Sequence, residues 1–118
     1  MINFRRADHV LITIPVGKRE EARRFYTQKL VLTEIPGEHP NNALWFQIGD
    51  IELHLIEEGT ENDRSARHPA FEVDDLEKAK AHLQNQGIEI SFSSKIKGRD
   101  RCFFRDPFGN RFELLCFE

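Results

Sequence analysis

The chain has 118 residues, enough for one domain with a single buried core. Hydrophobic residues make up 39% and charged residues 31%, a balance typical of an α+β protein with well-solvated helix surfaces. The net charge of −3 and the pI near 6.0 argue against nucleic acid or an anionic membrane as a partner.

The first half predicts the element order β-α-β-β-β. Its expected elements are a strand over 8–14, a helix over 18–30, and strands over 32–35, 43–48 and 51–57. The first strand alternates with a period of two and ends at Pro15, while the helix has apolar residues at spacings of three and four. Gly49-Asp50 is expected to form a tight turn between the last two strands.

The second half repeats this order after a polar linker over 58–67. Its expected elements are a strand over 68–73, a helix ending at Gln86, and strands over 88–92, 101–105 and 111–117. Asp74 or Asp75 is a suitable N-cap for the helix, and Gly87 a suitable residue to end it. The segment Asp106 to Asn110 has the proline and glycine of a turn between the last two strands.

Two patterns recur 59 residues apart, so we expect one domain (1–118) built from two modules, about 1–58 and 67–118. His9 corresponds to His68, and His54 corresponds to Glu113, since 68 − 9 and 113 − 54 are both 59. The repeated positions therefore include three imidazoles and a carboxylate, which are common metal ligands. The repeat by itself indicates a metal site.

The alternation of the strands places these four side chains on a common face. In the first and last strand of each module, one set of alternating positions is apolar and can pack on the helices. The opposite phase contains the four candidate ligands, His9, His54, His68 and Glu113. If the strands form one curved sheet, these groups converge in its concavity.

Several segments of the chain match a pattern found in known proteins. They are Asp8-His9-Val10, Arg24-Phe25-Tyr26, Gly49 to Leu55, His68 to Leu76 and Arg105 to Leu114. Together they resemble the vicinal oxygen chelate superfamily, which includes glyoxalase I, fosfomycin-resistance transferases, extradiol dioxygenases, methylmalonyl-CoA epimerase and bleomycin-binding proteins. The most specific segment has the pattern Asp-Pro-x-Gly-Asn-x-x-Glu-Leu, and the resemblance covers essentially the whole chain.

The resemblance implies a glyoxalase-like α+β fold, in which paired βαβββ modules form a curved mixed sheet around a divalent metal. The family's ligand positions correspond to His9, His54, His68 and Glu113, although three-ligand relatives leave the position of His54 to another group. Zn, Ni, Fe, Mn or Co would suit three imidazoles and a carboxylate. Many members are homodimers, so a homodimer is expected here, with modules paired within one chain or across the dimer.

The leading functional prediction is a metal-dependent enzyme of the glyoxalase type: a lyase, an isomerase or a thiol transferase. The metal would hold a small-molecule substrate through two adjacent oxygens, and Glu113 would be both ligand and catalytic base. Two alternatives stay open. One is an extradiol-type dioxygenase that uses His9, His68 and Glu113, and the other is a non-catalytic drug-binding protein of the bleomycin-resistance type.

Aromatic residues on the third strands could line the substrate pocket. Trp45 and Phe46 are adjacent, as are Phe103 and Phe104, so alternate members face the concavity. Alignments of the two third strands disagree about which members these are; our assignment is Phe46 and Phe103. Arg101 is placed to meet an anionic group of the substrate.

The sequence also bears on the two remaining histidines and on the cellular compartment. His39 and His82 have no repeat partner that could bind a metal, so they are expected to face solvent. No apolar run approaches the ~18 residues of a membrane span, and residues 1–8 lack the apolar stretch of a signal peptide. Cys102 and Cys116 have no metal or redox spacing, so we expect reduced thiols and a cytoplasmic protein.

Overall fold

The computed structural model describes residues 1–62 and 64–118. The chain divides into two compact units, Met1–Thr60 and Glu61–Glu118. Each unit has the order β-α-β-β-β and one four-stranded mixed sheet, which confirms the expected α+β fold class. Residue 63 belongs to the predicted linker over 58–67 and lies outside the described residues.

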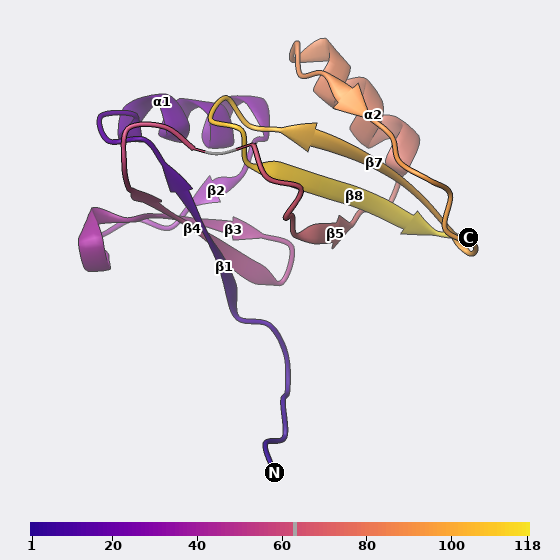
Figure 1. The fold of residues 1–118 in the computed structure, drawn as a ribbon, viewed down its shortest axis with the longest axis horizontal. Helices are drawn as coiled ribbons and strands as arrows, with labels where there is room; N and C mark the ends of the chain where they lie inside the picture. The colour runs from indigo at the N-terminus through magenta and orange to yellow at the C-terminus, as the bar shows by residue number, and fades with distance from the viewer. Residues whose placement is uncertain (63) are drawn as a thin grey trace. The chain divides into compact units, whose positions relative to one another are not determined.

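The first unit follows the predicted order (Figure 1). Its elements are β1 (His9–Ile14), α1 (Arg19–Arg24), the π-helical turn η1 (Phe25–Lys29), β2 (Thr33–Glu34), the 3₁₀ turn η2 (Pro40–Asn42), β3 (Leu44–Ile48) and β4 (Ile51–Glu57). The strand order is β1-β4-β3-β2, with β1 parallel to β4 and the other neighbours antiparallel. The single helix predicted over 18–30 is thus an α-helix that continues into a π turn.

The second unit has the same connectivity with different element lengths (Figure 1). Its elements are β5 (Ala70–Glu72), α2 (Leu76–Asn85), β6 (Ile90–Ser91), β7 (Arg99–Arg105) and β8 (Arg111–Phe117), and its strand order is β5-β8-β7-β6. The Asp75 side chain caps α2 by accepting a hydrogen bond from the Lys78 amide. Gly87, with φ of +74°, ends the helix as predicted.

The 59-residue repeat is also a repeat of strand register. In the first unit Leu11 of β1 lies opposite His54 of β4, and in the second unit Ala70 of β5 lies opposite Glu113 of β8. Both members of the second pair lie 59 residues beyond those of the first. The sequence repeat therefore places His54 and Glu113 at equivalent positions in their sheets.

Each sheet packs its apolar phase into a core. In the first unit Tyr26 is fully buried and its ring lies 5.5 Å from that of Phe46, while Leu53 and Leu55 of β4 are also buried. In the second unit the rings of Phe104 and Phe112 stack at 5.2 Å. Each such side chain contributes about 1.5–3 kcal/mol by leaving water. No helix among residues 1–62 and 64–118 has the length and hydropathy needed to cross a bilayer.

Candidate functional site

Four aromatic rings form a continuous stack on one face of the first unit's sheet. Trp45 of β3 lies opposite His54 of β4, and their rings are 4.1 Å apart and nearly parallel, at 4°. His9 stacks on the other face of His54 at 4.2 Å, and His39 stacks on the other face of Trp45 at 4.0 Å. Both faces of His54 are therefore covered, which explains why the residue is only 7% exposed.

Carboxylates contact two of the three histidines of this stack. Asp8 Oδ2 lies 3.0 Å from His9 Nδ1, and Glu52 Oε1 lies 2.9 Å from His54 Nε2. The hydrogen bond from His9, followed by the nearby positive charge of Arg6, lowers the pKa of the Asp8 carboxyl. A carboxylate at Nδ1 leaves Nε2 of His9 available, which is a common arrangement for a metal-binding histidine.

The stack borders a groove of about 370 Å³ in the first unit. Its sheet side includes His9, Trp45 and His54, and the segment Pro40–Asn42 contributes Pro40 and Asn41 to its wall. Asp8 and Glu52 are the charged residues of the lining.

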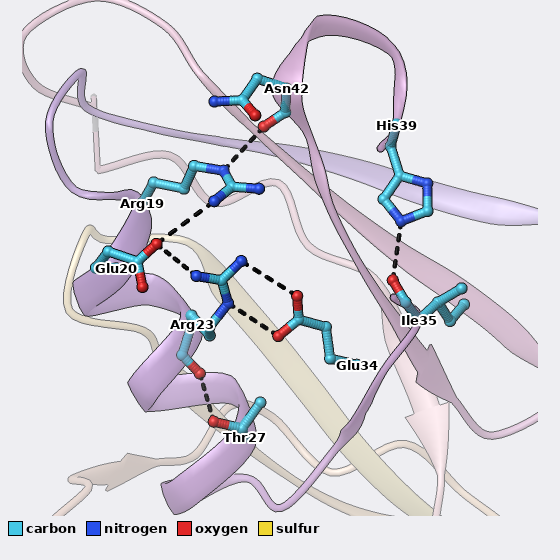
Figure 2. Close-up of polar contacts among 8 residues, drawn as sticks. All are labelled: Arg19, Glu20, Arg23, Thr27, Glu34, Ile35, His39 and Asn42. Carbon is cyan, nitrogen blue, oxygen red and sulfur yellow. Dashed lines mark hydrogen bonds and ion pairs between the residues drawn. The ribbon is translucent and has the colours of Figure 1, made fainter. Parts of the chain in front are cut away.

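Polar contacts fix the segment that forms this wall (Figure 2). Arg19 Nε donates to the Asn42 carbonyl at 3.1 Å, and His39 Nε2 donates to the Ile35 carbonyl at 2.8 Å. Arg23 of α1 contacts both Glu20 and Glu34, and the Glu34 hydrogen bond is the main cause that raises the Arg23 pKa. The groove wall is thus tied to α1, and α1 is tied to β2.

In the second unit His68 meets Glu113. His68 Nε2 lies 3.0 Å from Glu113 Oε1, and Glu113 is only 4% exposed. His68 Nδ1 lies 2.8 Å from the Ala66 carbonyl oxygen, which can only accept a hydrogen bond. Nδ1 therefore carries a hydrogen, and in the neutral imidazole Nε2 presents its lone pair to the carboxylate. Arg101 Nη1 also contacts Glu113 Oε1, at 3.4 Å.

The turn before β8 is built by one buried carboxylate. Asp106 Oδ1 accepts hydrogen bonds from the amides of Phe108 and Asn110, at 2.9 and 2.8 Å, and Oδ2 accepts from the Asn110 side chain at 2.8 Å. Gly109 has φ of +92°, a conformation that glycine adopts without strain. This turn fixes where β8 starts and thereby which face Glu113 occupies.

The pocket assignment of the third strands needs one correction. Phe103 lies opposite Glu113, on the face that carries the candidate ligands, and its side chain is buried. Phe46 instead lies opposite Leu53 and is fully buried toward Tyr26, so it does not line the ligand face. Trp45 occupies that place in the first unit.

The two hairpins differ by one residue in the spacing between paired residues of the ligand face, which explains why the assignment of Phe46 is wrong. Trp45 and His54 are nine residues apart, whereas Phe103 and Glu113 are ten apart, because the second hairpin has a longer turn. A shift of one residue moves a strand's side chains to the opposite face. The 59-residue offset therefore holds for the fourth strands and fails for the third.

Two residues of the stack were not assigned to the site from sequence. Trp45 could have been found from the hairpin alone, because a two-residue turn at Gly49-Asp50 pairs it directly with His54. His39 was expected to face solvent, but it is partly buried against Trp45. Its place depends on a loop without a repeat partner, so the sequence carries no comparable signal for it.

The structure brings the candidate ligands together in pairs, His9 with His54 and His68 with Glu113. No group of three or more His, Cys, Asp and Glu side chains that could hold a metal gathers among the described residues. His68 Nε2 and Glu113 Oε1 are 3.0 Å apart, an ordinary hydrogen-bond distance that neighbouring ligands of an octahedral ion at ~2.1 Å would also have. Parallel stacked rings cannot both direct in-plane lone pairs at one ion, so His54 would have to turn.

Comparison with known families gives one match. Residues 6–114 match the Glyoxalase/Bleomycin resistance protein/Dioxygenase superfamily. A comparison with curated proteins gives no match.

Solved structures resemble the chain over nearly its whole length. A glyoxalase family protein from Bacillus anthracis has 35% identity and a TM-score of 0.88, with 100% of both chains covered. A glyoxalase family protein from Enterococcus faecalis has 27% identity and a TM-score of 0.76, covering 95% of this chain and 98% of the other. TnmS3, an antibiotic binding protein from Streptomyces sp. CB03234, has 18% identity and a TM-score of 0.75, covering 98% and 100%; this likeness shows the fold alone.

Proposed function

Because the chain belongs to the Glyoxalase/Bleomycin resistance protein/Dioxygenase superfamily, we propose that it is a metal-dependent enzyme of the glyoxalase type. Its substrate would be a small molecule that presents two adjacent oxygens. The proposed ligands are His9 from the first module and His68 and Glu113 from the second, with the modules paired within one chain or across a homodimer. His54 would be a fourth ligand only after its ring leaves the stack.

The contact between His68 and Glu113 carries this proposal. With a hydrogen on Nδ1, His68 turns its other ring nitrogen, Nε2, toward a carboxylate oxygen 3.0 Å away. Two acceptors at this distance need a cation between them, either a proton or a metal ion. The separation also suits two neighbouring ligands of one divalent ion.

Glu113 is the catalytic base of the proposed reaction. Its carboxylate is nearly buried, at 4% exposure, so water competes little for its oxygens. Arg101 and His68 hold Oε1, which would fix the carboxylate in one orientation toward a substrate. In the proposed reaction Glu113 takes the proton from the substrate carbon and returns it to the product. A bound divalent ion would supply the positive charge that stabilises negative charge on the substrate oxygens.

Elemental analysis of untagged protein tests the proposal. We expect a stoichiometric divalent metal in the parent protein, and its loss in the variants His68→Ala and Glu113→Ala. Matched controls are His82→Ala and Glu89→Ala, which remove the same side-chain types from exposed positions of the second unit. A parent protein that stays metal-free after loading with Zn, Ni, Co, Mn or Fe(II) would contradict the proposal. Metal retained in His68→Ala or Glu113→Ala would also contradict it.

A second candidate is a ligand-binding protein without catalysis, of the kind that the antibiotic binding protein TnmS3 represents. The groove of about 370 Å³ beside the aromatic stack of the first unit supports it. Titration of Trp45 fluorescence with aromatic antibiotics separates the two functions. Tight binding without turnover, in protein that holds no metal, would favour the second candidate.

A further inference from the structure

Cationic side chains surround Phe103 in the second unit. Phe103 lies opposite Glu113, and its buried ring has the Arg111 guanidinium carbon 3.9 Å from its centroid and that of Arg101 at 5.2 Å. His68 meets the same ring edge-on at 5.1 Å. Arg101 and Arg111 each lie two residues from a member of the Phe103–Glu113 pair, so they share its face of the sheet.

The positive charge around this ring is incompletely balanced. Arg101 Nη2 donates to the Ser94 carbonyl at 2.7 Å, and Arg111 Nη1 donates to the Ala66 carbonyl at 3.3 Å. Glu113 contacts Arg101 only at 3.4 Å, and Arg111 has no carboxylate within ion-pair distance among residues 1–62 and 64–118. Arg101 is 13% exposed in its side chain, and its Nε is buried without a partner in the described chain.

Neighbouring groups add to this positive charge. Burial, and next the nearby positive charges of Arg64 and Arg111, lower the pKa of Arg105. The equivalent face of the first unit has the opposite character, because the charged residues that line its groove are Asp8 and Glu52. The two copies of the repeat therefore differ in the charge they present beside their candidate ligands.

We propose that Arg101 and Arg111 bind an anionic group of the substrate, a carboxylate or a phosphate, beside Glu113. This inference rests on the proposed function, which it narrows to substrates that carry such a group. Guanidinium groups present several N–H donors in a fixed plane that matches both kinds of anion, at about 2.8 Å. The Phe103 ring, 3.9 Å from the Arg111 guanidinium carbon, helps to hold this group in place.

Titration of metal-free protein by amide NMR tests this site separately from the metal. The probes are inorganic phosphate and benzoate, with benzyl alcohol as an uncharged control. We expect saturable shifts of the Phe103 and Glu113 amides with at least one anion and none with benzyl alcohol. If only phosphate or only benzoate gives saturable shifts, the anionic group of the substrate is assigned as a phosphate or a carboxylate accordingly. Absence of a saturable shift with both anions would overturn the proposal.

Substitutions assign the binding to the two arginines. Arg111→Gln and Arg101→Gln are each expected to raise the dissociation constant at least about tenfold, the usual loss for a charge-assisted hydrogen bond. Arg24→Gln removes the same charge from an exposed position of α1 and should leave it unchanged. Arg111→Lys keeps the charge and should recover part of the affinity, which a merely structural role would not require.

Two results would refute the assignment. Dissociation constants within about twofold of the parent in both glutamine variants would exclude the arginines as ligands. An equal loss in Arg24→Gln would mean that only net charge matters. If Arg101→Gln proves unfolded by circular dichroism, the Arg111 variants decide alone, because Arg111 has no ion pair in the described chain to lose. Metal content measured on each variant as purified, before the metal is removed for the titration, shows whether the proposed function fails independently.

Discussion

Removal of the Asp106 carboxylate should destabilise the fold by a measurable amount. The group is 5% exposed and accepts hydrogen bonds from two backbone amides and one side-chain amide. Asp106→Ala removes all three. At about 1 kcal/mol for each net hydrogen bond, and with water reaching the half-buried donors, we expect a loss of about 2–3 kcal/mol. The variant Asp106→Asn retains one accepting oxygen, so it should lose only about 1 kcal/mol.

Urea unfolding monitored by the fluorescence of Trp45, the chain's single tryptophan, measures both losses. The Asp106→Ala loss corresponds to a drop in melting temperature of about 6–15 °C for a chain of this size. A loss below about 0.5 kcal/mol, the usual range for a surface substitution, would refute the role given to this carboxylate. Equal losses in the two variants would also refute it, because the alanine variant removes more acceptors.

Substitutions at two further positions test a surface ion pair and a strained backbone conformation. Lys95 pairs with Asp100, which raises the pKa of Lys95 above 10.5 and lowers that of Asp100 below 3.8. The pair therefore stabilises the fold between those pH values. In urea unfolding, Lys95→Met should lower the free energy of unfolding at pH 7, and this loss should shrink as the pH falls below 3.8. A loss that stays constant with pH would contradict this. Val31 is 65% exposed and has φ of +59°, a backbone conformation that is strained for valine but not for glycine. Val31→Gly should therefore stabilise the fold by about 0.5–1 kcal/mol, whereas Val31→Ala should not. A glycine variant less stable than the parent would contradict this.

The sequence was sufficient wherever a local pattern determines the structure. The two βαβββ units, the Asp75 cap, the Gly87 helix end and the turn at Asp106 all follow from residues close together in the chain. The equivalence of His54 and Glu113 also follows, because the repeat preserves register between the first and last strand of each unit.

The sequence was insufficient where one residue changes the face of a strand. Alignments of the two third strands disagree, and our assignment of Phe46 to the ligand face is wrong because the shorter first hairpin places Trp45 there. His39 reaches the stack through a loop in which Asn41 and Asn42 have positive φ, and such a path follows from tertiary contacts with Arg19 and Trp45. The stacking of His54 likewise depends on two neighbouring strands, which supply His9 (β1) and Trp45 (β3).

We propose that His68 and Glu113 bind a divalent ion. Long-range nitrogen NMR of the His68 ring during zinc titration tests this most directly, because it reports each ring nitrogen separately. We predict that Nδ1 carries the hydrogen throughout, and that Nε2 shifts to a metal-bound value at stoichiometric zinc in the parent but not in Glu113→Ala. A ring that stays protonated on both nitrogens, paired with Glu113 and unchanged by zinc, would contradict the account.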